Sequence, residues 1–112
     1  MTVENLAETL ALTPICLPEP DREVTGGYAG DLLSWVMGRA KSGDAWLTIM
    51  TNQNILAVAT LADTACVIIA EDSEIGEDLA GLAEKKGVNL LKSGKSVFDL
   101  AVRLGTLLDK QV

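Results

Sequence analysis

Apolar and polar residues fall into blocks along the chain, and the period changes from one block to the next. Leu6 and Leu10 lie four residues apart behind Thr2, a spacing typical of a short capped helix over about residues 3–10. The run from Thr13 to Leu17 is short and apolar, with prolines at positions 14, 18 and 20. Because proline cannot donate to a strand ladder, this run predicts an edge strand that leads into a turn.

The middle of the chain alternates between helical and strand-like periods. Apolar residues at helical spacing predict a helix that Asp31 caps and residues 41–43 end; they are Leu32, Leu33, Val36, Met37 and Ala40. A strand is predicted over residues 45–50. Residues 55–61 are apolar almost all round, so periodicity alone permits a helix or a strand, and the alanines and the position between two strands favour a helix.

The carboxyl half has the clearest pattern. Residues 65–70 form a continuous apolar run of the kind that is buried on both faces of a parallel sheet. A helix follows, with acidic residues at 77 and 78 near its start and Lys85-Lys86-Gly87 at its end. A short strand over residues 88–91 precedes a last helix, which Ser96 and Asp99 cap as an S-x-x-D pattern.

Strands that alternate with helices predict an α/β fold, with a mostly parallel sheet of about five strands flanked by helices in two or three layers. We expect residues 1–112 to form one domain, because no linker or repeat interrupts the pattern. Ligands of such sheets bind outside the carboxyl ends of the strands. This edge is expected to collect residues 28–31, 51–54, 71–73 and 92–96.

The segment from Asp21 to Asp31 breaks the pattern, because it holds three glycines within five positions. Such a cluster indicates unusual backbone dihedrals or a close approach to another group. We predict a strand around Val24 and Thr25, followed by a turn. Asp21 and Arg22 then have two interpretations, a local ion pair that fixes the turn or half of a contact surface.

Composition narrows the class of function. Of the 112 residues 48% are apolar and 22% charged, as in ordinary globular domains, and the formal charge of −7 repels nucleic acid and anionic lipid. No apolar run approaches the roughly 20 residues that span a bilayer, and the start lacks the features of a secretory signal. We therefore expect a cytoplasmic protein that binds neither nucleic acid nor membrane.

Cys16 and Cys66 both lie in apolar surroundings, and the sequence has no histidine. Free cysteine is by default a small buried hydrophobe, so we expect both to belong to the core. Without histidine, zinc sites of the Cys and His type and histidine-based triads are excluded. We expect no metal site and no cofactor.

Two short motifs imitate nucleotide-binding loops. Gly94-Lys95-Ser96 lies between a strand and a helix, as the end of a P-loop does, but Asn89 stands where the first glycine of that motif belongs. We predict a helix cap with a solvated lysine, and a simple anion site at that helix end is the alternative. The glycines at 26, 27 and 30 do not follow the G-x-G-x-x-G spacing, and Trp46 stands where the acidic residue is expected.

Aromatic residues suggest how copies of the chain associate. Trp35 lies beside the apolar stripe of the second helix and Tyr28 just before it, so an exposed aromatic patch for self-association is predicted. Trp46 is expected in the core or at a subunit contact.

The segment Asp21-Arg22-Glu23-Val24-Thr25-Gly26-Gly27 resembles the signature of the DRTGG domain family, with Asp-Arg and Thr-Gly-Gly separated by two residues. The carboxyl half is also similar to the amino-terminal domain of HPr kinase/phosphorylase, and related domains occur in phosphotransacetylases and between the CBS domains of some inorganic pyrophosphatases. The resemblance implies an accessory, regulatory or dimer-forming unit without the kinase, and it transfers no catalytic residue.

The sequence thus predicts a non-catalytic regulatory or adaptor domain that forms a homodimer, with a small anionic or nucleotide-like ligand, or a protein, as a further partner. Candidate binding or interface residues are Asp21, Arg22, Thr25, Gly26, Gly27, Tyr28, Asp31, Thr51, Asn52, Lys95 and Ser96. Two alternatives stay open: a small phosphoryl- or acyl-handling enzyme that uses Lys95 and Ser96, and a structural subunit of a larger kinase or redox assembly.

Overall fold

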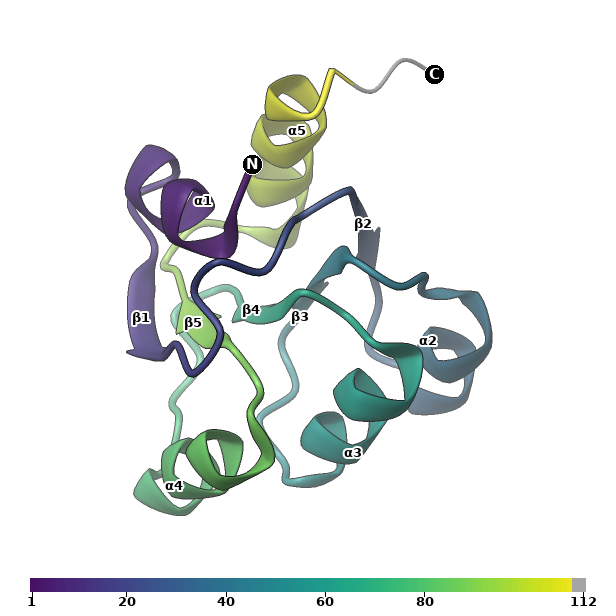
Figure 1. Cartoon of the computed structure of the whole chain (residues 1–112), viewed down its shortest axis with the longest axis vertical. Coiled ribbons are helices and arrows are strands. Elements are labelled where there is room, and N and C mark those ends of the chain that lie inside the picture. The colour runs from purple at the N-terminus through teal and green to yellow at the C-terminus, as the bar shows by residue number, and fades with distance from the viewer. Residues whose placement is uncertain (110–112) are drawn as a thin grey trace.

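A computed structural model describes residues 1–109 and shows a five-stranded sheet between two layers of helices (Figure 1). The elements in chain order are α1 (Val3–Thr9), β1 (Thr13–Cys16), β2 (Gly26–Ala29), α2 (Leu33–Arg39), β3 (Asp44–Thr48), α3 (Asn54–Ala62), β4 (Cys66–Ile69), α4 (Glu77–Lys86), β5 (Leu90–Lys92) and α5 (Val97–Leu107). The predicted α/β class is confirmed. Within residues 1–109, no helix combines the length and apolar character needed to cross a membrane.

The strand order is β1-β5-β4-β3-β2, and β2 to β5 run parallel. β1 pairs antiparallel with β5, so the prediction of a mostly parallel sheet with an edge strand at residues 13–17 is confirmed. β3 and β4 lie in the middle, and all of their residues are buried, as a sheet covered on both faces requires. β2 forms the other edge and has β3 as its one partner.

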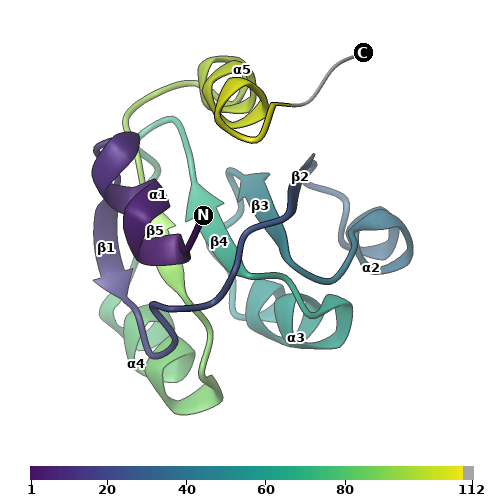
Figure 2. The ribbon, with the colours of Figure 1, turned by 45° about the horizontal axis from the view of Figure 1, so that its top comes forward.

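The helices cover the two faces of the sheet unequally. α1 and α5 lie on one face, and α2, α3 and α4 lie on the other (Figures 1 and 2). The first core joins Leu6 of α1 to Leu100 and Leu104 of α5. The second core packs α2, α3 and α4 around Trp46 and Val67. The sheet is therefore the middle layer of three.

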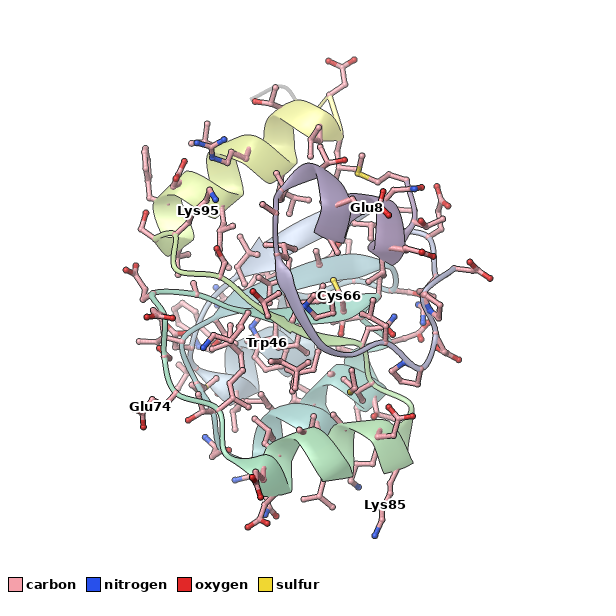
Figure 3. All side chains as sticks on the ribbon, turned by 90° about the vertical axis from the view of Figure 1, so that its left-hand side faces the viewer. Glu8, Trp46, Cys66, Glu74, Lys85 and Lys95 are labelled. Carbon is pink, nitrogen blue, oxygen red and sulfur yellow. The ribbon has the colours of Figure 1, made fainter. Side chains whose placement is uncertain are left out.

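Cys66 and Trp46 mark these two cores on opposite faces of the sheet (Figure 3). Burial raises the pKa of the Cys66 thiol to about 12, and burial together with Glu84 raises that of Cys16. The Cys16 thiol donates to the carbonyl oxygen of Val88. Both cysteines are free thiols; Cys66 is buried in the core, as predicted, whereas Cys16 is only partly buried at the edge strand.

Several helix ends follow the sequence signals. The Thr2 side chain accepts from the Asn5 N–H, and Ser96 Oγ accepts from the Asp99 N–H at 3.0 Å. Gly87 ends α4 in the left-handed region with φ +70°. The predicted caps at Thr2, Gly87 and Ser96 are confirmed.

The prediction of a strand at Val24 and Thr25 is wrong, because the strand is formed by Gly26–Ala29, the glycines themselves. Val24 instead lies buried in the first core, and its N–H donates to the Met1 carbonyl. The Thr25 N–H donates to the Gly43 carbonyl and sets the register in which Gly26 faces Asp44. Glycine suits this strand because neighbouring side chains approach its backbone so closely that they leave no room for a Cβ.

The prediction that Asp31 caps the second helix is also wrong. The cap residue is Leu32, without a side-chain hydrogen bond. Asp31 Oδ1 accepts from Thr48 Oγ1 at 2.7 Å and from the Ile49 N–H at 2.9 Å. The carboxylate thus joins β2 to the end of β3 and is not available to the helix.

Candidate functional site

The candidate residues predicted from sequence lie at two opposite ends of the sheet. Asp21, Arg22 and Thr25 precede β2 and lie at the amino ends of the parallel strands. The remaining polar candidates follow the strands at the carboxyl ends; they are Asp31, Thr51, Asn52, Lys95 and Ser96. The four residues of β2 alone separate the two groups by about 13 Å, so they do not form one small-molecule site.

At the carboxyl edge, the polar side chains are engaged by the protein's own backbone. Asp31 binds the end of β3 as described, and Asn52 Oδ1 accepts from the Asn54 N–H at 2.9 Å. The Ser93 hydroxyl accepts from the Lys95 N–H at 3.0 Å. These contacts fix the loops of this edge.

Glu71 occupies the start of α5, where the sequence suggested an anion site. Its Oε2 accepts from the Val97 N–H at 3.2 Å, while Ser96 Oγ takes the Asp99 N–H. Carboxylate and hydroxyl thus satisfy N–H groups that a bound anion needs. Lys95 lies beside the start of α5 in Figure 3, and its carbonyl accepts from the Glu71 N–H. Gly94-Lys95-Ser96 is a helix cap, as predicted.

At the amino edge, Arg22 pairs with Asp63 rather than with its neighbour Asp21. Its guanidinium lies 3.1 Å from Asp63 Oδ1 and donates at 2.8 Å to the Asp63 carbonyl oxygen. Ser42 Oγ donates to the other carboxylate oxygen of Asp63 at 2.5 Å. The interpretation of an ion pair between residues 21 and 22 is therefore corrected: Arg22 holds the turn against the end of α3, 41 residues away.

These two contacts lower the pKa of Asp63, with the Ser42 hydrogen bond as the larger cause and Arg22 next. A lowered folded-state pKa contributes stability that is present above the unfolded value of 3.8 and is lost as the pH falls through the folded value.

Asp63→Asn is expected to lower the unfolding free energy at pH 7 by less than about 1 kcal/mol, because the carboxylate is largely exposed. The difference from wild type is expected to shrink as the pH falls below 3.8 and to vanish once it is below the lowered folded-state pKa, where both chains are neutral at this position. Urea denaturation at pH 7 and at the acid end measures it. Asparagine also tolerates the left-handed backbone of residue 63, so a loss that persists at low pH would contradict an electrostatic origin.

Asn89 ties the segment before Arg22 to the sheet. Its Nδ2 donates to the carbonyl oxygens of Glu19 and Ala65 at 2.7 and 3.0 Å, and its Oδ1 accepts from the Glu19 N–H at 2.9 Å. The side chain is 2% exposed. Nothing in its local sequence signals this role, since its partners lie 70 and 24 residues away.

A pocket of about 210 Å³ lies at this amino edge, between Arg22, Asp63, Lys86 and Asn89. α3 and α4 both end here, at Asp63 and Gly87, and helix carboxyl termini carry partial negative charge. Glu19 also lines the pocket. Among residues 1–109, the buried Thr64 hydroxyl that lines it has no hydrogen-bond partner. The helix dipoles and the carboxylates of Glu19 and Asp63 make this pocket unfavourable for an anion, although Arg22 and Lys86 also line it.

A larger pocket, of about 460 Å³, lies against the open edge of the sheet at β2. It brings four candidate residues together with side chains from the end of α2 and the start of β3; the lining is Thr25, Gly26, Gly27, Tyr28, Arg39, Lys41, Ser42 and Asp44. We refer to it as the β2 pocket.

The two signature glycines in β2 have packing roles. A Cβ on Gly27 would lie 2.6 Å from Leu104 Cδ2 of α5, and one on Gly26 would lie 2.7 Å from Asp44 Oδ1. Gly27 therefore lets α5 approach the sheet, and Gly26 makes room for a carboxylate that is 7% exposed. The close approach predicted for this segment is thus to parts of the protein itself.

Sequence reasoning did not identify Arg39, Lys41 and Asp44 as site residues. Lys41 was interpreted as part of a helix stop and Asp44 lies at the start of a strand, so neither position suggests a binding role by itself. The available signal was two cations within three positions in a chain of charge −7, next to the strand that pairs with the glycine segment.

No protein-family model matches the chain, and no curated protein matches it in sequence. Among solved structures, the chain is similar to the CBS and DRTGG domains of the regulatory region of Clostridium perfringens pyrophosphatase, in complex with its activator diadenosine tetraphosphate. The TM-score is 0.67 at 17% identity, over 92% of this chain and 45% of that chain. The chain thus spans less than half of that structure, and the likeness supports a CBS- or DRTGG-like fold alone.

Proposed function

We propose that this chain is a regulatory domain that binds a small anionic or nucleotide-like ligand and carries out no catalysis. The observation that carries this proposal is the β2 pocket, in which residues of the glycine segment adjoin two cations at an open sheet edge. The fold likeness supports it, because the similar structure is a regulatory region that holds a nucleotide activator. Membership of the DRTGG family is part of the proposal.

A thermal-shift screen of nucleotides and phosphorylated metabolites tests ligand binding. A ligand that binds the folded state alone raises the melting temperature, by an amount that grows with the logarithm of the ratio of its concentration to the dissociation constant. A flat response across a broad panel at millimolar concentration would remove the sensing half of the proposal.

We also propose that the chain forms a homodimer. The interface that we propose lies on α5 rather than on the aromatic patch at Trp35. On α5 the residues that face away from the sheet form a second apolar stripe, composed of Phe98, Ala101, Val102 and Gly105. Phe98 is 78% exposed and Val102 is 52% exposed. Apolar residues on both faces of a surface helix indicate a contact beyond the domain's own core.

The stripe is self-complementary in an antiparallel pair of α5 helices. With a twofold axis beside Ala101 and Val102, Phe98 of one copy lies over Gly105 of the other. An apolar groove of about 260 Å³ runs there, between α5 and β2, lined in part by Gly27 and Leu47. Asp99 and Arg103 flank the stripe and, in this arrangement, face residues of opposite charge in the other copy. In this dimer, the Phe98 ring of the second copy fills the apolar groove, and Asp99 and Arg103 of the second copy lie opposite the charged residues at the edge of the groove.

Phe98→Asp is expected to convert the dimer into a monomer, because a carboxylate would lose solvent in the apolar groove. Multi-angle light scattering across a concentration series measures the mass. Trp35→Asp is the matched control, since Trp35 is 51% exposed on the opposite helix layer. A monomeric wild type at high concentration rejects the dimer, and dissociation by Trp35→Asp alone would return the interface to the aromatic patch.

The rival enzyme hypothesis depends on Lys95 and Ser96. Ser96 Oγ already accepts the Asp99 N–H as the cap of α5, so this hydroxyl has a structural role at the helix end. The structure therefore gives less support to this hypothesis than to ligand binding. Turnover of a phosphoryl or acyl substrate that Lys95→Ala abolishes would reverse this order.

A further inference from the structure

Resting on the proposed sensing function, we infer that the β2 pocket is the ligand site, and that it takes a phosphate ester carrying free hydroxyl groups. The phosphate binds Arg39 and Lys41, and a hydroxyl of the same ligand donates to Asp44. This chemistry is shared by nucleotides and sugar phosphates. The site lies beside the amino half of β2 and not at the carboxyl edge of the sheet.

The distribution of charge favours the β2 pocket over the amino edge and the carboxyl edge of the sheet as a site for an anion. Among residues 1–109, neither Arg39 nor Lys41 takes part in an ion pair. At the amino edge, by contrast, Asp63 pairs with Arg22 and Glu19 offsets the charge of Lys86 in the pocket lining, and at the carboxyl edge Lys92 lies 3.5 Å from Asp72. The β2 pocket is lined by two cations and one carboxylate, that of Asp44, so its lining carries a net positive charge in an acidic chain.

Arg39 is held in an orientation that suits phosphate. The central carbon of its guanidinium lies 3.7 Å from the centroid of the Trp35 ring, so the flat face of the group is covered. Stacking leaves the in-plane N–H groups free, and these are the donors that bind phosphate in a bidentate manner. Trp35 thus positions Arg39 and reduces the side-chain entropy that binding would otherwise remove.

Asp44 supplies the contrasting acceptor. Its Oδ2 accepts from the Lys41 N–H at 2.8 Å, which fixes the loop that carries Lys41. Its Oδ1 lies over Gly26 and has no hydrogen-bond donor among the described residues. A carboxylate oxygen that lines the pocket and has an unused lone pair favours a hydroxyl donor and repels a second phosphate. The pocket therefore distinguishes a phosphate ester of a polyol from inorganic phosphate.

Size and hydrogen-bonding groups agree with such a ligand. About 460 Å³ is within the range of small-molecule sites and well above the volume of one phosphate group. The Thr25 hydroxyl lines the pocket and adds a donor, whereas Ser42 Oγ already donates its hydrogen to Asp63 and can offer the ligand only an acceptor. As the edge strand, β2 also keeps one row of its backbone groups unpaired on the outer side.

Calorimetric titration of the full chain with AMP, ribose 5-phosphate, inorganic phosphate and adenosine tests the site. We expect AMP or ribose 5-phosphate to bind more tightly than inorganic phosphate, and adenosine to bind weakly. Arg39→Gln with Lys41→Gln should weaken the phosphate ester at least about tenfold, since two charge-assisted contacts are lost. Lys92→Gln with Lys95→Gln changes the net charge equally at the carboxyl edge and should leave the affinity within about twofold.

Asp44→Asn keeps an acceptor for the Lys41 N–H but removes the carboxylate, so it should reduce the preference for the ester over inorganic phosphate. If a ligand binds wild type and the Arg39/Lys41 variant equally well, the site assignment fails while the sensing function stands. Loss of binding in the Lys92/Lys95 variant alone would move the site to the carboxyl edge. If wild type binds no member of the panel, both this assignment and the sensing of such phosphate esters fail.

Discussion

Replacing Asn89 by leucine is expected to lower the free energy of unfolding by about 3 kcal/mol, with the fold retained. Leucine has nearly the same size but removes three hydrogen bonds, two with the backbone of Glu19 and one with the carbonyl oxygen of the buried Ala65. Unpaired buried polar groups cost more than the lost bonds alone. Guanidinium denaturation followed by far-ultraviolet circular dichroism measures the change.

Asn52→Leu is the control for Asn89→Leu. Asn52 is exposed, and its side chain makes one local bond, to the Asn54 N–H. We expect this variant to lose less than about 1 kcal/mol. Similar losses in the two variants would mean that the hydrogen bonds of Asn89 with Glu19 and Ala65 add nothing to stability.

Gly43→Ala is expected to destabilise the protein by about 2 to 3 kcal/mol, through two causes. Gly43 has φ +86°, in the left-handed region, and an added Cβ would collide with Thr25 Oγ1. Gly43 also cannot move away easily, because its N–H donates to the Asp63 carbonyl and its carbonyl accepts from the Thr25 N–H. The same denaturation experiment measures the loss.

Gly87→Ala separates the two causes. Gly87 has φ +70°, but a Cβ there meets nothing within 4 Å, so it carries the backbone strain without the collision. We expect a loss of about 1 kcal/mol for this variant. The difference between the two glycines then reports the contact with Thr25, and equal losses would show that Thr25 adjusts freely.

The larger part of the fold follows from local sequence signals. β4 was predictable because residues 65–70 are apolar without interruption, as a strand covered on both faces must be. α4 and α5 were predictable because Gly87 and Ser96 provide the backbone freedom and the hydroxyl that helix ends require. Such signals lie within a few residues of their effect.

The errors concern residues whose partners lie far along the chain. β2 has little strand propensity and forms by pairing with β3; glycine suits position 27 because Leu104, 77 positions later, fills the space where a Cβ would lie. Asp31 has the residue type and position of a helix cap, but the Thr48 hydroxyl and Ile49 N–H compete successfully for its carboxylate. Propensity does not report such competition between local and tertiary partners.

The candidate site was predicted in part for the same reason. Four residues of the glycine segment line the β2 pocket, and their role in binding stays a prediction. The carboxyl-edge rule for parallel sheets directed attention to the end where Glu71 and Asp31 already fill the available positions. Arg39 and Lys41 reach the pocket through the pairing of β2 with β3, which the sequence does not display.

The layer that α1 and α5 form on one face of the sheet also constrains how the chain folds as it is made. Its core joins Leu6 to Leu100 and Leu104, so residues from the two ends of the chain must meet before this face is covered. The other layer is built from helices and strands that neighbour one another in sequence. On the ribosome, therefore, the α2–α4 side can assemble early, while the α1 side waits for synthesis to pass Leu104 and exposes its apolar strands until then.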